Sequence, residues 1–225
     1  MSDAVEVWSS EGDDARVGTL YSSRRRGVDS ATFAYADTWL GSPHGYAIDP
    51  QLSLSAAPHH TAVSQGIFGA LSDGAPDRWG RTLLLRQEAR AARTEGRSPR
   101  SLGELDFLLG VRDDLRQGAL RYRQDGGAFL ATDADGVPLL TDLPSLLDIA
   151  ARAERDAADL PDLNRLVHAG GSLGGARPKA HVRAPDGSLA IAKFPSADRD
   201  TWDVMTWEHV LLVLARRAGI DVPRS

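Results

Sequence analysis

The sequence of 225 residues contains no cysteine. Disulfide scaffolds, cysteine-ligated zinc, iron–sulfur clusters and thiol nucleophiles are therefore excluded. No segment approaches the run of about 18 apolar residues that a membrane-spanning helix needs. The N-terminal segment MSDAVEVWSSEGDD is acidic and lacks the apolar region of a signal peptide. These absences predict a cytoplasmic protein with no membrane partner.

Positive charge is in deficit, because 26 Lys and Arg residues stand against 31 Asp and Glu residues, for a net charge of −5. This balance argues against a whole surface built to bind a polyanion, although it leaves room for a local basic patch. Hydrophobic residues at 42% and charged residues at 25% are typical of a folded globular chain. The length fits one large domain or two small ones.

Strand signals dominate the first part of the chain. Residues 5–8 and 16–21 are β-rich runs on either side of a turn-forming stretch, which predicts a hairpin. Residues 125–138 combine Gly, Pro and Asp, so we expect a loop there and a domain boundary. Beyond it, the turn Pro185-Asp186-Gly187 predicts a second hairpin. The remaining strand candidates are residues 31–35, 52–55, 118–122, 178–184 and 188–194.

Helices are predicted in four places. Pro76 is expected in the first turn of a helix that runs to Gly96. The other helical candidates are residues 101–110, ending at Gly103 or Gly110, residues 144–158, and residues 201–219. In the last of these, apolar residues recur at steps of three and four and predict one apolar face. They are Val204, Trp207, Leu211, Leu214 and Ala218.

The most informative stretch is a glycine-rich loop, GGSLGG at residues 170–175, followed by the second hairpin. Glycines let a backbone turn tightly and direct N–H groups at a phosphate. The loop is not a Walker A motif, because Ala176 and Arg177 occupy the places of its Lys and Ser/Thr. It precedes a hairpin rather than a helix, which argues against a Rossmann unit. A Gly-rich loop between two strands, with a lysine on the next strand, is typical of protein kinases.

Lys193 adds weight to this interpretation. Strand alternation places it on one face with Leu189 and Ile191, where a charge needs a partner. Glu208, on the next predicted helix, is the candidate. Simpler interpretations stay open: the loop is only a loop, Lys193 reaches solvent, and Glu208 is an ordinary surface residue.

Several segments together resemble the HipA-like toxin kinases of bacterial type II toxin–antitoxin modules. They are GGSLGGARPKAHV, LAIAKFPS, WEHVLLVLARRAGIDVP, SDGAPDRWGRTLL, FLLGVRDDLRQGALRY and the opening hairpin. The resemblance implies an α+β fold with a β-rich N-terminal subdomain over residues 1–125. Residues 140–225 would then form part of a protein-kinase-like small lobe.

By this resemblance, loop 170–175 would cover the phosphates of ATP. Lys193 would pair with the α- and β-phosphates, Glu208 would orient Lys193, and Lys179 would be a second basic position. Ser172 matches a loop serine that family members autophosphorylate; a plain turn residue is the alternative. The set implied to bind the nucleotide is Gly171, Ser172, Gly174, Gly175, Lys179, Lys193 and Glu208.

The chain departs from the family in length, because family members are about twice as long. The catalytic-loop Asp and Asn and the Mg²⁺-binding Asp are expected beyond Ser225, in a second lobe. We therefore expect no catalytic residue in this chain and no activity from it alone. We expect ATP and Mg²⁺ to bind as cofactors when that lobe is present, and weakly or not at all to this chain alone. The six histidines show no metal-binding spacing, so no metal site is predicted.

The resemblance implies a helix-turn-helix antitoxin as partner and contact with DNA only through it; the substrate protein cannot be read. An alternative is a non-enzymatic module that binds a kinase toxin or an antitoxin and regulates it. A stand-alone nucleotide-binding protein is a third hypothesis. Asp73, Asp77 and Arg78 near Trp79 are interpreted as charge at a helix N-terminus, with a partner surface as the alternative. The apolar surface on which the second lobe would dock predicts poor solubility or self-association of the chain alone.

Overall fold

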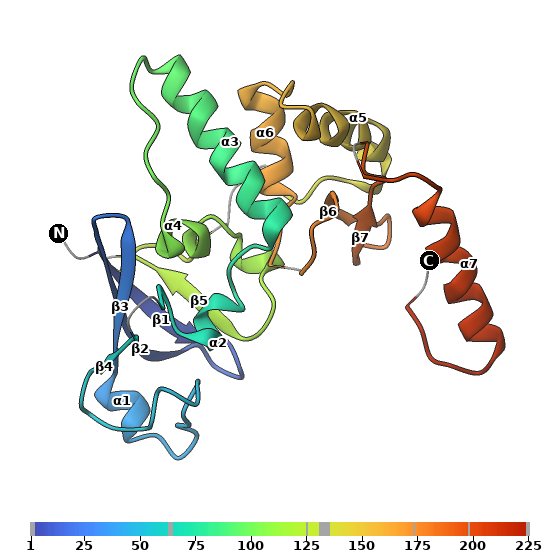
Figure 1. Cartoon of the computed structure of the whole chain (residues 1–225). Coiled ribbons are helices and arrows are strands. Elements are labelled where there is room, and N and C mark those ends of the chain that lie inside the picture. The colour runs from blue at the N-terminus through green and yellow to red at the C-terminus, as the bar shows by residue number, and fades with distance from the viewer. Residues whose placement is uncertain are drawn as a thin grey trace.

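The computed structural model describes residues 3–62, 65–124, 126–130, 136–172, 174–197 and 199–223. It is a mixed α/β structure in which an antiparallel sheet lies beside a group of helices that cover a small hairpin (Figure 1). In the described residues no helix is long and apolar enough to cross a membrane.

An antiparallel sheet of five strands, in the order β4-β3-β2-β1-β5, organises the first half. The predicted opening hairpin is confirmed, with Val5 opposite Leu20 and Val7 opposite Gly18. Alternate residues of these strands are buried and form the first core, together with side chains from α1, α2 and α4. The strands are β1 (Asp3–Ser9), β2 (Ala15–Arg25), β3 (Val28–Tyr35), β4 (His59–His60) and β5 (Leu120–Arg123). The three short helices are α1 (Asp37–Leu40), α2 (Gly69–Ser72) and α4 (Glu104–Leu109).

The predicted strand at residues 52–55 is wrong. Leu52 is completely buried, but it enters the core alone from an irregular segment. Its backbone N–H donates to Asp49 O at 2.9 Å within a turn, and its carbonyl accepts from the Tyr35 hydroxyl at 2.7 Å. These bonds use the groups that a neighbouring strand would need.

The long helix α3 (Arg78–Thr94) begins later than Pro76 suggested. Asp77 is its N-cap, and the Asp77 carboxylate accepts from Gly80 N at 2.8 Å, so Pro76 lies outside the helix. Interpreting Asp77 as charge at a helix N-terminus is thus confirmed. The prediction for residues 101–110 holds with α4, which Gly110 terminates as its C-cap.

The second core forms where α3, α5 (Leu143–Glu154) and α6 (Leu160–His168) pack on the hairpin β6 (Lys179–Arg183) and β7 (Leu189–Lys193). Helix α5 is shorter than the predicted 144–158, because Asp156 takes a positive φ of 55° just after it. Helix α6 was not predicted, although Asp159 directly precedes it as its N-cap, a position where aspartate is a preferred residue. Two short 3₁₀ turns, η1 (Asp113–Leu115) and η2 (Leu140–Asp142), complete the element list.

The second core draws side chains from both parts of the chain. Trp79 and Leu83 of α3 belong to the second core, although α3 lies within the first 125 residues. The domain limits 1–125 and 140–225 stay a prediction. Residues 125 and 131–135 of the expected boundary loop lie outside the described residues.

The last helix, α7 (Val204–Arg217), projects away from both cores (Figure 1). The structure describes every residue of α7, and none is buried. The predicted apolar face is exposed: Trp207 is 55% and Leu211 62% accessible. Gly219 follows the helix with a φ of 79°, as expected for a residue after a C-cap.

Candidate functional site

The glycine-rich loop connects α6 to β6, so the expectation that it lies between two strands is wrong. The reason is helix α6, which occupies the place where the kinase-like order would put a strand. The loop rests on the hairpin at Gly171. A Cβ there would lie 2.4 Å from a ring carbon of His181 and 2.6 Å from Leu115 O, so only glycine fits. Gly175 has a φ of 124°, a conformation that side chains rarely adopt. Leu173 lies outside the described residues.

Lys179 and Lys193 are the only lysines among the 26 basic Lys and Arg residues of the sequence. They are register partners in the β6–β7 ladder and therefore lie opposite each other on one face of the hairpin. Like charges in this position repel. A chain that otherwise uses arginine thus places both of its compact ammonium groups at one point beside the glycine-rich loop.

Glu208 of α7 neutralises one of these charges through an ion pair with Lys193. Both side chains are partly exposed, Lys193 at 46% and Glu208 at 38%. The structure thus brings together the lysine and the glutamate that strand alternation and helix position had paired. This ion pair links α7 to the hairpin.

Asp77 neutralises the other lysine through an ion pair with Lys179. This pair is well buried, with 12% of Lys179 and 7% of Asp77 accessible. The Asp77 carboxylate therefore caps α3 with one oxygen and holds a lysine of the hairpin with the other. Sequence reasoning missed this second role, because the two residues are 102 positions apart.

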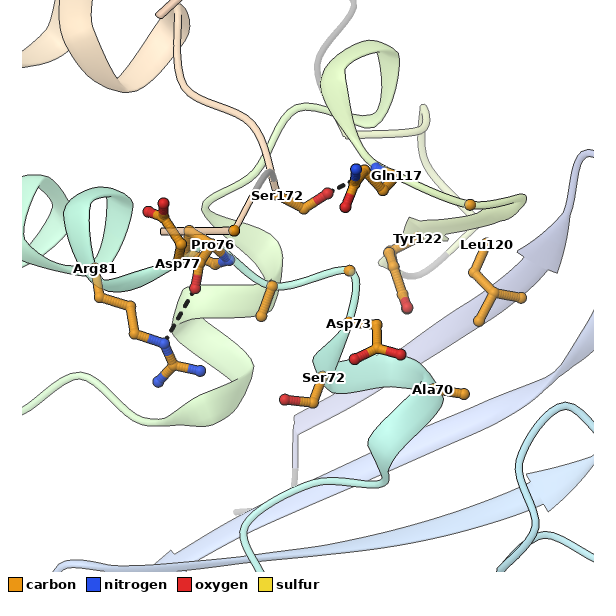
Figure 2. A pocket seen from close by; sticks show the side chains of 14 residues that line it. Ala70, Ser72, Asp73, Pro76, Asp77, Arg81, Gln117, Leu120, Tyr122 and Ser172 are labelled. Atoms are coloured by element: carbon orange, nitrogen blue, oxygen red, sulfur yellow. Dashed lines mark hydrogen bonds between the residues drawn. The ribbon is translucent and has the colours of Figure 1, made fainter. Parts of the chain in front are cut away.

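Ser172 is bonded to the N-terminal half of the chain. Its buried hydroxyl accepts a hydrogen bond from Gln117 N at 2.6 Å (Figure 2). Ser172 and Gly174 line an open cavity of about 600 Å³, whose other walls include Asp73, Arg81 and Tyr122. The loop therefore closes one side of a cavity that both halves of the molecule line with polar and apolar groups.

His181 lies beneath the loop on β6. Its ring Nδ1 is 3.3 Å from Ala169 O, and its backbone N–H donates to the same carbonyl at 2.7 Å. Burial lowers the pKa of His181, so the ring favours its neutral form. His181 thus packs against the loop as a buried side chain that favours its neutral form.

Metal-binding side chains are not gathered anywhere in the part of the chain that the structure describes. No group of three or more His, Cys, Asp or Glu residues in it could hold a metal ion. The residues present at the loop are donors and cations, which suit phosphate oxygens rather than a metal.

Comparison with known proteins identifies the family. The model of the HipA N-terminal domain matches residues 6–126, which is more than half of the chain. The model of the HipA-like C-terminal domain matches residues 171–225, a range that contains the loop, both lysines and Glu208. A search of the curated proteins gave no significant match. Two domain models in the expected order, one covering the sheet and the other the loop and hairpin, show that the chain belongs to the HipA family.

Proposed function

We propose that this chain is the nucleotide-phosphate-binding portion of a HipA-like serine/threonine protein kinase toxin. The observation that carries the proposal is the pair Lys179 and Lys193, opposite each other beside a glycine-rich loop. Two adjacent ammonium groups and a loop of backbone N–H donors suit the clustered negative charges of ATP. In this proposal residues 140–225 belong to a kinase-like small lobe.

Each residue has a distinct task in the proposed site. The loop Gly171–Gly175 would surround the phosphates, with Gly171 fixed on His181 and Gly174 free of neighbours within 4 Å. Lys193 would contact the phosphates and Glu208 would orient it through the ion pair. Lys179 would add the second charge, held in place by Asp77.

Mg²⁺ would enter this site with the nucleotide. No acidic cluster among the described residues fits the metal ion, so its ligands here would be phosphate oxygens of ATP. We assign no step of phosphoryl transfer to these residues, whose proposed work is to bind and orient the phosphates.

Ser172 is the proposed regulatory phosphorylation site. Its hydroxyl is buried and bonded to Gln117 N, so the loop must leave its place before the hydroxyl can reach a phosphoryl donor. A phosphoserine carries a charge of about −2 and three acceptor oxygens, which this buried position cannot hold. Phosphorylation would therefore keep the loop out and remove the ATP-phosphate site.

The direct test is calorimetric titration of Mg²⁺-ATP into the wild-type chain, Lys193→Met and Arg183→Met. Arg183 lies on the same strand as Lys179 and is exposed, so its variant controls for general charge loss. We expect wild-type binding that weakens at least tenfold, about 1.4 kcal/mol, in Lys193→Met only.

A second measurement follows the chemical reactivity of the two lysines. The amino terminus, Lys179 and Lys193 are the primary amines of the chain, so acylation by an amine-reactive reagent reports on each separately. ATP should protect both lysines and leave the amino terminus reactive. Absence of binding by a correctly folded wild-type chain would overturn the proposal.

A non-enzymatic module that engages a kinase toxin or an antitoxin is the second candidate. The exposed apolar face of α7 favours it, because such a face is typical of a protein-binding surface. Within the family proposal, a helix-turn-helix antitoxin is the expected partner, and DNA is reached through it.

A further inference from the structure

A second cavity, with a volume of about 280 Å³ and a mostly polar lining, lies at the N-terminal end of α3. Its charged walls come from Arg78 and Arg86 of α3, Arg199 after β7, and Glu154 at the end of α5. Trp79 also lines it and belongs to the second core, which packs on the face of the hairpin opposite the two lysines. The cavity adjoins the proposed nucleotide site, because Ala176 of its lining directly follows Gly175 of the loop, but no residue assigned to the nucleotide lines it.

Two residues that line this cavity each carry a buried donor without an acceptor among the described residues. These donors are the indole Nε1 of Trp79, a residue only 5% accessible, and the terminal Nη1 of Arg86. A buried N–H without a partner costs about 1–3 kcal/mol, and such groups are rare in native structures. Both atoms are explained if an acceptor-bearing ligand binds there.

The charge of the cavity points to an anion. Arg86 forms an ion pair with Asp156 at 3.8 Å, whereas Arg78 and Arg199 form none within the part of the chain that the structure describes. The carboxylate of Glu154 is already used, because it accepts from Ser196 Oγ and from Ala197 N, both at 2.7 Å. Arg86 donates from its other terminal nitrogen to the Glu154 carbonyl at 3.1 Å. The site therefore has positive charge and donors in excess.

We propose that this cavity is a binding site for a phosphate group, either free orthophosphate or a small phosphomonoester. A phosphate offers at least three acceptor oxygens, whereas a carboxylate offers two. Three guanidinium groups and an indole N–H match the larger number, and arginine is the preferred partner of phosphate. The volume fits a small anion and is below the usual range for larger ligands.

The experiment follows the indole signal of Trp79 in the ¹⁵N-labelled full chain. A Trp79→Phe variant assigns that signal among those of the five tryptophans. Sodium phosphate is titrated at constant ionic strength, with sodium chloride as the reference. We expect a saturable shift with a Kd of about 1 mM or tighter for the Trp79 signal.

Variants locate the site. Arg78→Met and Arg199→Met remove exposed side chains, so the fold should survive, and each should weaken binding at least fivefold. Arg183→Met, on the far end of the hairpin, should leave it unchanged. Lys193→Met should also leave it unchanged, so this test stays independent of the proposed nucleotide site.

The two sources of phosphate are separated by O-phosphoserine. Tighter binding of O-phosphoserine than of orthophosphate assigns the site to phosphomonoesters, and the reverse assigns it to the free anion. A shift that does not saturate with either compound, or that persists equally in Arg78→Met and Arg199→Met, would overturn the proposal.

Discussion

Lys179 and Lys193 lie opposite each other in the β6–β7 ladder, and each is held by a carboxylate from a different helix. Asp77 comes from the start of α3 and Glu208 from α7. The two ion pairs differ in burial, because the first is enclosed and the second is open to solvent. The same chemical pair should therefore contribute differently to stability at the two positions.

Removing Asp77 should destabilise the protein more than removing Glu208. Breaking a buried pair costs about 3–5 kcal/mol, and losing an N-cap about 1 kcal/mol, so Asp77→Ala should lose at least about 3 kcal/mol. An exposed pair contributes about 0–1 kcal/mol, so Glu208→Gln should be nearly neutral. Urea unfolding followed by circular dichroism measures both.

Asp77→Asn is the matched control, since it keeps an oxygen for Gly80 N and removes the charge that holds Lys179. It should fall between wild type and Asp77→Ala. Equal losses in Asp77→Ala and Glu208→Gln would contradict the difference in burial.

Substitution by alanine should destabilise the protein at Gly171 but not at Gly174. A Cβ at Gly171 meets His181 and Leu115 closer than 3 Å, whereas Gly174 has no neighbour within 4 Å. Gly171→Ala should cost about 1–3 kcal/mol, the usual range for overpacking, and should displace the loop. Gly174→Ala should be close to neutral in stability. Thermal unfolding and limited proteolysis of the loop test this, and a stable Gly171→Ala with an intact loop would refute it.

Acid should remove the contribution of the Arg81–Glu104 pair. Arg81 donates from both terminal nitrogens to Glu104 at 2.7 Å, which lowers the pKa of Glu104. A carboxylate with a lowered pKa stabilises the fold above its unfolded pKa of about 4.3 and loses this effect as the pH falls through the lowered value. The gap in unfolding free energy between wild type and Glu104→Gln should therefore narrow below about pH 4.3.

Urea unfolding at pH 7 and at several values below pH 5 measures that gap. Asp221→Asn, an exposed carboxylate at the end of the chain, is the control and should show a small effect at every pH. A gap that stays constant down to the acid limit would show that Glu104 titrates alike in both states.

The exposed face of α7 should cause self-association. Leu211 and Leu214 are more than half accessible, and Leu189 and Ile191 of β7 are also exposed. Sedimentation velocity should show concentration-dependent association that Leu211→Lys reduces and sulfate strengthens. Arg217→Lys, on the same helix, should leave it unchanged. A wild-type monomer at all concentrations would contradict the prediction.

Features with a local physical cause could be read from the sequence. The hairpins follow from strand alternation and turn residues, and the end of α4 follows from Gly110. The Lys193–Glu208 pairing was also accessible, because it links neighbouring elements. The strand prediction for residues 52–55 failed because a leucine that is buried from within a turn looks, in the sequence, like a leucine of a strand. Helix α6 was missed because it is short and its signal rests on a single cap, Asp159.

Contacts between distant segments were decided by the tertiary structure alone. Asp77 meets Lys179 across 102 positions, and Gln117 meets Ser172 across 55. The cavity beside Trp79 likewise gathers side chains from α3, α5 and the segment after β7. The sequence by itself determined most of the elements, the glycine-rich loop and the family resemblance, because local hydrogen bonding and side-chain periodicity set them. Which charges are paired, which donors are left without a partner and which apolar face stays exposed depend on how the helices pack, and only the fold decides this.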